Sequence, residues 1–356
     1  MRVRLEDVCE KESSKLKQSD VIDQNGMYPV YGASGYLGNI NTYQQSNYYI
    51  AVVKDGAGIG RTMLLPPESS IIGTMQYLIP KDNVLPEYLY YVVKAKHLEK
   101  YFSGATIPHI YFKDYKNEQF DLVSFEEQRE IINRLKKIEI IIDNLSKNLL
   151  LLDELVKARF VEMFGDPFLN EKGWITKPLI DMGNCKNGMN FHYNENGCEV
   201  KCLGVGDFKD LSIINNIESL QTVSLNEMPS EEYMLRDNDI VFVRSNGNKA
   251  LVGRSIVIYP GDVPTTFSGF CIRYRKYDDS IIVPYLLHVL KTDSFRNKMV
   301  GRGANIQNLN QQILASLIIP VPPLELQNQF ASFVQEIDKS RLLSNHSLFL
   351  IKSIIF

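Results

Sequence analysis

The sequence predicts an α+β fold in which two globular domains of mixed α/β structure are separated by two long antiparallel coiled-coil helices. A heptad pattern of apolar residues runs through residues 125–164, and the same pattern returns 199 residues later. Shorter motifs between the two patterns also recur at similar offsets, over more than fifty residues. A repeat of this kind indicates an internal duplication and a pseudo-twofold molecule.

The first heptad pattern places apolar residues at alternating steps of four and three. Its positions are Ile131, Leu135, Ile138, Ile142, Leu145, Leu149, Leu152 and Val156. Such spacing gives a helix one narrow apolar seam, which is typical of pairing with another helix. The helix would be roughly 55–60 Å long, and Gly165-Asp166-Pro167 is a typical helix stop.

The second pattern has the same phase, with a polar interruption in its middle. Its positions are Phe330, Val334, Ile337, Arg341, Ser344, Leu348, Ile351 and Ile355. Two equivalent seams can bury each other as an antiparallel pair. In the alternative, each helix would pack on its own globule, but such helices usually carry a wider apolar stripe.

The remaining sequence reads as two related globular domains. Strand composition at residues 48–53, 70–73 and 76–79 precedes a helix opened by Pro86 and running through Lys94. Residues 239–244 and 285–291 repeat the first strand and the helix, and Gly253-Arg254-Ser255 repeats Gly60-Arg61-Thr62. We expect domains at 1–112 and 165–312, with helical spacers at 113–164 and 313–356.

Composition favours a cytoplasmic protein with reduced thiols and no membrane segment. The chain has 44% hydrophobic residues, no apolar run near eighteen residues, and five scattered cysteines. Cys198, Cys202 and His192 lack an evident fourth ligand and the spacing of a zinc knuckle, so we expect no metal site. The net charge of −3 counts mildly against nucleic-acid binding but leaves room for a local basic patch.

Several motifs resemble the specificity subunit of type I restriction–modification systems. They are Gly301-Arg302-Gly303-Ala304-Asn305-Ile306, the apolar strand 317–321 with Pro322-Pro323-Leu324-Glu325-Leu326-Gln327, the first copy at 104–107 and 120–128 without its prolines, and Val161-Glu162-Met163-Phe164-Gly165-Asp166-Pro167. The second helical pattern stops at Phe356, earlier in its register than the first at Phe164. Another segment supplies its last turn, or the chain is truncated.

The resemblance implies a non-catalytic subunit with two target-recognition domains, each reading one half of a bipartite site in double-stranded DNA. It also implies that the helices dock methyltransferase subunits and, in the full complex, endonuclease/translocase subunits. Helix pairing and partner docking would involve Ile131, Leu135, Ile138, Ile142, Leu145, Leu149, Leu152, Val334, Ile337, Leu348 and Ile351.

DNA reading requires side chains that reach base edges and cations that reach phosphates. Arginine can pair with guanine, and Asn or Gln with adenine. In the first domain the candidates are Ser34, Lys54, Arg61, His109, Tyr111 and Lys113; in the second they are Arg244, Asn246, Lys249, Arg254, Arg302, Asn305, Gln307, Asn308 and Asn310. Alternatively, the loop 244–249 is a plain solvated hairpin and residues 301–312 form a polar cap for the next element.

The glycine-rich loop 55–60 raises the alternative of a nucleotide or S-adenosylmethionine site. The following Thr62-Met63-Leu64-Leu65-Pro66-Pro67 cannot open a helix cleanly, and neither a Gly-Lys-Ser/Thr nor an Asn-Pro-Pro-Tyr motif is present. We therefore expect no cofactor. Two other functions stay open: a DNA methyltransferase or nuclease with its own catalysis, and a coiled-coil adaptor for proteins.

Overall fold

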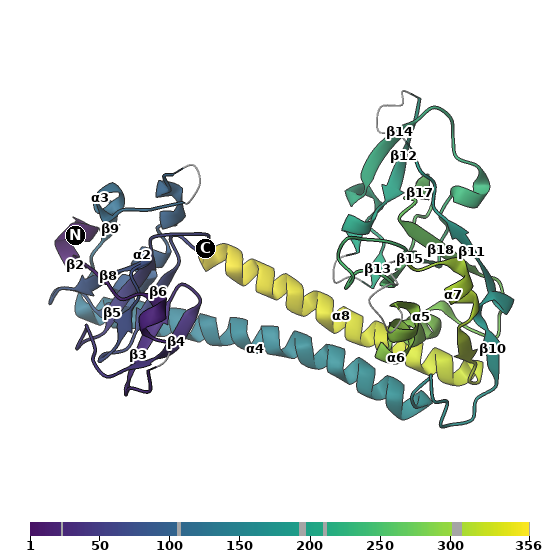
Figure 1. The fold of residues 1–356 in the computed structure, drawn as a ribbon, viewed down its shortest axis with the longest axis horizontal. Helices are drawn as coiled ribbons and strands as arrows, with labels where there is room; N and C mark the ends of the chain where they lie inside the picture. Colours follow the sequence, from purple (N-terminus) through teal and green to yellow (C-terminus); the bar gives the residue numbers. More distant parts are fainter. Residues whose placement is uncertain (23, 105–107, 192–196, 209–211, 301–307, 356) are drawn as a thin grey trace. The chain divides into compact units, whose positions relative to one another are not determined.

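The computed structural model describes residues 1–356 except 23, 105–107, 192–196, 209–211, 301–307 and 356. The chain forms two compact units. The first comprises Met1–Ser146 and Ser347–Phe356, and the second comprises Lys147–His346. The division falls within the two long helices, and each unit is described by itself (Figure 1).

The first unit is built on a four-stranded antiparallel sheet. In spatial order its strands are β2 (Cys9–Ser13), β8 (Met75–Pro80), β5 (Tyr49–Val53) and β6 (Thr62–Leu65). Every residue of β5 is buried, because Ile50 and Val52 pack with helix α2 (Pro86–Lys94) while Tyr49, Ala51 and Val53 belong to a second apolar cluster. Burial on both faces explains why this strand is continuously apolar.

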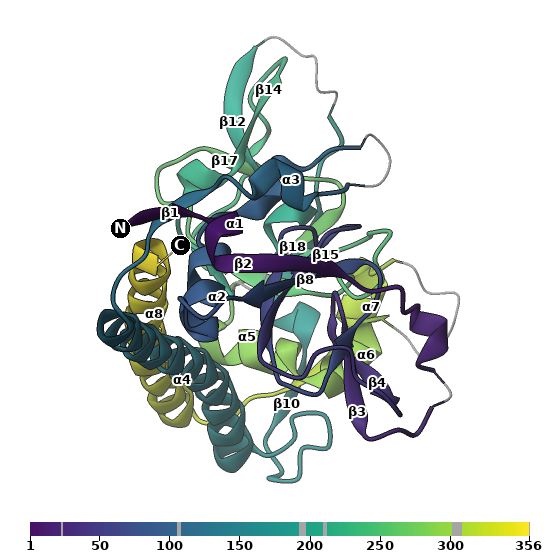
Figure 2. The same ribbon diagram turned by 90° about the vertical axis from the view of Figure 1, so that its left-hand side faces the viewer.

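A second, smaller sheet completes the strands of the first unit. Its central strand β3 (Tyr28–Gly32) pairs antiparallel with β4 (Gly35–Ile40) and parallel with β7 (Ser70–Ile71). In Figure 2, β2 lies alongside β8, and β3 alongside β4. The short elements are η1 (Gln18–Asp20), η2 (Leu98–Tyr101) and α3 (Phe112–Tyr115).

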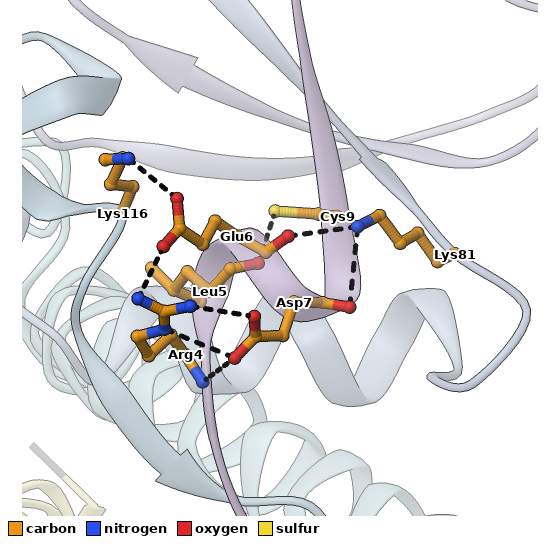
Figure 3. Close-up of polar contacts among 7 residues, drawn as sticks. All are labelled: Arg4, Leu5, Glu6, Asp7, Cys9, Lys81 and Lys116. Carbon is orange, nitrogen blue, oxygen red and sulfur yellow. Dashed lines mark hydrogen bonds and ion pairs between the residues drawn. The ribbon is translucent and has the colours of Figure 1, made fainter.

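The beginning of the chain is fastened to the end of the first unit. Strand β1 (Arg2–Arg4) pairs antiparallel with β9 (Gln119–Asp121), directly before the first long helix. Helix α1 (Leu5–Val8) follows β1, and Lys116 Nζ donates to Glu6 Oε2 at 2.8 Å (Figure 3). Lys81 Nζ donates to the Glu6 carbonyl at 3.0 Å, which ties the same turn to β8.

The second unit repeats this frame with an insertion. Its large sheet contains, in spatial order, β11 (Gly183–Asn187), β18 (Cys271–Lys276), β15 (Asp239–Val243), β16 (Ser255–Ile258) and the added β13 (Ile213–Ile214). Its small sheet again has a central strand with one antiparallel and one parallel neighbour: β12 (Cys198–Leu203), with β14 (Gln221–Leu225) and β17 (Thr265–Phe267). Strand β15 is buried on both faces, as β5 is.

The other elements of the second unit also follow the first. Strand β10 (Thr176–Pro178) pairs with β19 (Ile318–Pro320) as β1 pairs with β9. Helix α5 (Val283–Lys291) corresponds to α2, and α6 (Asp293–Val300) and α7 (Gln311–Ala315) follow it. Short 3-10 turns lie at η3 (Leu179–Asp181), η4 (Val205–Asp207), η5 (Ile217–Ser219) and η6 (Glu231–Tyr233).

One glutamine fastens the start of each long helix in the same way. Gln128 Oε1 accepts from the Leu85 backbone N–H at 2.8 Å, and Gln327 Oε1 accepts from that of Ile282 at 2.9 Å. Each amide nitrogen donates to the carbonyl five residues upstream, at 3.0 and 2.7 Å. Both side chains are buried, so these bonds replace water that the amides cannot reach.

The long helices α4 (Phe125–Phe164) and α8 (Leu324–Ile355) pack together through the predicted seams. In the second unit, Phe160 and Phe164 of α4 pack on Phe330 with ring centroids 5.4 and 5.6 Å apart. Arg341 farther along α8 pairs with Asp153, so the two helices run antiparallel there.

The seam positions are the protected ones on both helices. Every described position of the two predicted seams is buried or part-buried, and most of their neighbours are exposed. Arg341, which interrupts the apolar pattern, is compensated by ion pairs with Asp153 and Asp338. The predicted fold class, with two mixed α/β domains and two long packed helices, is confirmed.

The predicted strands and helices are also confirmed. Strands lie within 48–53, 70–73, 76–79 and 239–244, and α2 has the predicted bounds Pro86–Lys94. Residues 113–124, predicted as part of the first spacer, hold most of α3 and all of β9 before α4 begins. The four domain boundaries stay a prediction.

Candidate nucleic-acid interface

In the first unit, the loop between β5 and β6 presents two of the predicted cations. The Val53 backbone N–H donates to the Arg61 carbonyl and the Gly60 N–H donates to the Val53 carbonyl, both at 2.9 Å. Gly60 has φ +80°, and a Cβ there would lie 2.5 Å from the Glu99 backbone nitrogen. Only glycine fits this turn, which holds Lys54 and Arg61 at the two ends of one loop.

The segment around His109 lies against this loop. The Ile110 N–H donates to the Lys54 carbonyl at 2.9 Å and the Gly56 N–H donates to the Pro108 carbonyl at 3.0 Å. His109 Nδ1 donates to Asp55 Oδ1 at 2.6 Å. Two loops that are distant in sequence therefore form one surface.

Further predicted residues join the same surface. The His109 and Tyr111 rings stack with centroids 6.4 Å apart, and Lys113 Nζ lies 5.4 Å from the Tyr111 ring centroid. Arg61 Nη1 donates to the Ala33 carbonyl at 2.8 Å, directly before exposed Ser34 at the turn between β3 and β4. We call the resulting set the first polar site: Ser34, Lys54, Asp55, Arg61, His109, Tyr111 and Lys113.

The second unit builds the same backbone frame at its own β15–β16 loop. The Leu309 N–H donates to the Arg244 carbonyl at 2.8 Å, and Ser245 and Asn308 form an antiparallel bridge as Asp55 and His109 do. Gly253, with φ +74°, donates to the Val243 carbonyl at 2.9 Å, as Gly60 does to Val53.

The side chains on this second frame are different. Arg244 Nη1 donates to the Gly269 carbonyl at 3.2 Å, and Arg254 Nη1 to the Phe208 carbonyl at 3.4 Å. Asn246 Oδ1 accepts from the Asn248 N–H at 2.8 Å, while the Lys249 side chain is exposed. The second polar site therefore comprises Arg244, Ser245, Asn246, Lys249, Arg254 and Asn308.

Four other predicted residues do not join this set. Asn310 N-caps α7, because its Oδ1 accepts from the Ile313 N–H at 2.9 Å; this is the capping role that the sequence offered as an alternative. Arg302, Asn305 and Gln307 lie outside the described residues.

Asp55 and Ser245 were missed as candidates. Their signal in the sequence was their place, one residue after the predicted cation at the end of an apolar strand in each repeat.

The other sequence alternatives find little support among the described parts of the chain. The segment after the glycine-rich loop forms strand β6 and not a helix. No group of three or more His, Cys, Asp or Glu side chains suited to a metal lies within the described residues, and His192 falls outside them. All five cysteines are free, and burial raises the pKa of Cys9 and of Cys202 to about 12.

The long helices also expose apolar side chains on the face away from their seams. We call this set the outer helical face: Ile140, Ile141, Leu150, Leu151, Leu155 and Val161 on α4, and Leu342, Leu343, Phe349 and Leu350 on α8. Leu150 and Leu342 are 66% and 71% exposed. Large exposed apolar sets usually mark a surface that another molecule covers. No described helix combines the length and apolarity needed to cross a membrane.

The family model for the type I restriction modification DNA specificity domain matches residues 1–152 and 171–351. The chain belongs to this family. It is thus the DNA specificity subunit of a type I restriction–modification system and part of that complex, and specificity subunits are not catalytic. The family assignment argues against a chain with its own methyltransferase or nuclease activity and against an adaptor for proteins alone.

Named relatives agree with this assignment. The specificity subunit is 24% identical to the type I restriction enzyme MjaVIII specificity subunit of Methanocaldococcus jannaschii, over 81% of this chain and 72% of that one. It is 25% identical to the StySPI specificity subunit of Salmonella potsdam, over 77% of this chain and 63% of that one.

Two solved structures share the fold. The S subunit from M. genitalium is 17% identical with a TM-score of 0.60, over 100% of this chain and 93% of that one. A chain from a study of complex assembly and conformational transition of the type I R-M system is 16% identical with a TM-score of 0.57, over 100% and 95%.

Proposed function

We propose that each unit of the specificity subunit reads one half of a bipartite site in double-stranded DNA. The observation that carries this proposal is the repeated hydrogen-bonded frame with unlike side chains. Lys54, Asp55 and His109 in the first unit correspond to Arg244, Ser245 and Asn308 in the second. Equal frames suit equal docking on the duplex, and unlike side chains suit different base sequences.

The cations of the two polar sites are proposed to contact phosphates. Arg61, Lys113 and Lys249 are exposed, and Lys54, Arg244 and Arg254 are part-buried at the same loops. Phosphate contacts position a protein on DNA without selecting bases, and they supply much of its affinity. A local group of cations reconciles DNA binding with the net charge of −3.

We further propose that the outer helical face docks the methyltransferase subunits. The seam residues listed for pairing already contact the other helix, so they are not free for a partner. The exposed leucines, isoleucines and Phe349 supply apolar area that a tightly bound subunit would cover. The endonuclease/translocase subunits would join the full complex in the cytoplasm, where the DNA lies.

Exchange of one recognition unit tests the half-site proposal. Residues 168–300 are replaced by the equivalent stretch of a relative, and the methylated sequence of the assembled complex is mapped by single-molecule sequencing. One half of the site should change, while the other half and the gap between the halves stay the same. A change in both halves, or in neither, would contradict independent reading by two units.

A further inference from the structure

We propose that His109, positioned by Asp55, reads a base edge in the half-site of the first unit through its Nε2 atom, and that Asn308 has the equivalent role in the second unit. This inference rests on the proposed DNA-reading function and names its specificity-determining side chains.

The contact with Asp55 decides which nitrogen of His109 faces outward. An ionised carboxylate only accepts hydrogen bonds, so Nδ1 carries the proton that bridges the 2.6 Å to Asp55 Oδ1. Among the described residues Nε2 has no hydrogen-bond partner, and the His109 side chain is 35% exposed. Nε2 is therefore the polar atom that this ring presents to a ligand.

The imidazole is also held rigidly. The His109 backbone exchanges two hydrogen bonds with Ser103, both 2.8 Å, and its neighbour Ile110 donates to Lys54. Tyr111 stacks on one face of the ring at an interplanar angle of 22°. A reading group discriminates between bases only if its direction is fixed before DNA arrives, and these contacts fix it.

The repeat gives the second unit a different side chain at the same place. Asn308 lies 199 residues after His109 and bridges Ser245, the counterpart of Asp55. A histidine with Nδ1 occupied offers one polar atom, whereas an asparagine amide offers a donor and an acceptor and can bond adenine bidentately. The two units should therefore prefer different bases at this position.

The test uses the specificity subunit assembled with its methyltransferase subunits. In one variant, Asp55→Ser is combined with His109→Asn, which gives the first unit the pair of the second. Methylation rates are measured on the natural site and on all its single-base-pair substitutions. We expect the preference at one base pair of one half-site to fall or switch by about tenfold or more. All other positions, including the whole other half-site, should keep their preferences.

Two further variants separate positioning from mere stability. Asp55→Ala should weaken discrimination at that same base pair, while the matched control Asp55→Asn keeps an accepting oxygen and should retain it. A uniform fall in methylation on all sequences, with no change in preference, would show that His109 acts only structurally and would overturn the inference.

Arg61→Glu in the same complex distinguishes failure of this inference from failure of the proposed function. Loss of DNA affinity with Arg61→Glu, together with unchanged preferences in the Asp55→Ser/His109→Asn variant, would overturn the role of His109 alone. If both variants bind and methylate DNA as the unmodified complex does, reading by the first polar site is wrong as well.

Discussion

Single side chains connect each long helix to its unit. Gln128 and Gln327 carry paired hydrogen bonds at the start of α4 and α8, and removing one would strand a buried backbone N–H at a cost of about 1–3 kcal/mol. At the opposite end of α4, His288 of α5 packs between aromatic rings. Its centroid lies 6.3 Å from that of Phe160 and 4.9 Å from that of Phe330, and its Nδ1 donates to the Pro284 carbonyl at 2.8 Å.

This environment makes stability depend on pH through His288. Burial lowers its pKa from 6.5 to about 4, so below pH 6.5 the unfolded chain binds a proton that the folded chain does not. The free energy of unfolding should thus fall between pH 6.5 and pH 4 and be unaffected by this group at higher pH. His288→Leu should reduce the loss between pH 7.5 and pH 5 by about 1–2 kcal/mol.

Urea unfolding of the purified subunit at the two pH values measures this difference. Carboxylates titrate in both proteins, so the quantity that counts is the difference between the two pH effects. His346→Leu is the control, because His346 is exposed on α8 and should leave the pH effect unchanged. An equal loss in His288→Leu and the unmodified chain would contradict a buried neutral His288.

At the scale of the element, each long helix has two apolar faces with separate roles. The seam packs against the other helix, and in the second unit it joins the core around Val156, Phe330 and Ile337. The outer helical face makes no comparable contact and leaves leucines such as Leu151 more than half exposed. Packing within the subunit and docking of a partner are therefore open to independent mutation.

Adjacent leucines on α4 test this separation. Leu152 is part-buried against the core of the second unit, whereas Leu151 is 58% exposed. Leu152→Asp should destabilise the subunit by several kcal/mol, because a carboxylate loses its water in the seam. Leu151→Asp should change the stability by less than about 0.5 kcal/mol but weaken assembly with the methyltransferase subunits.

Thermal unfolding and analytical ultracentrifugation of mixed subunits would measure the two effects. If Leu151→Asp leaves assembly intact, docking through the outer helical face at this point is wrong. If Leu152→Asp leaves stability intact, the seam contributes less than its packing indicates.

The sequence predicts elements well where the signal is local and periodic. The heptads predict α4 and α8, and the uninterrupted apolar runs predict β5 and β15. It does not predict which distant side chains meet. Asp55 and His109 are separated by 54 residues, and no spacing rule pairs them. Short strands such as β3 and β4 contain mixed polar and aromatic residues, so no clean alternation marks them.

The whole molecule is a duplicated frame with diverged contents. The large sheet, the small sheet, the helix after them and the glutamine at the start of the long helix recur in both units, whereas β13 and its flanking turns occur in the second unit's insertion. This division explains how one subunit could read two different half-sites: the repeated frame sets the geometry of docking, and the residues at the loops set the sequence.

The length of the helices should set the gap between the two half-sites. One heptad is inserted into α4 next to Leu145 and one into α8 next to Leu348, so that both seams keep their register. Seven residues add roughly 10 Å of helix, the length of about three base pairs. Methylation mapping should find both half-sequences unchanged and the gap longer by about three base pairs. Insertion into α4 alone is the control, because it leaves one heptad of seam without a partner and should lower stability. A folded, active double-insertion variant with an unchanged gap would show that the helices do not measure the distance between the halves.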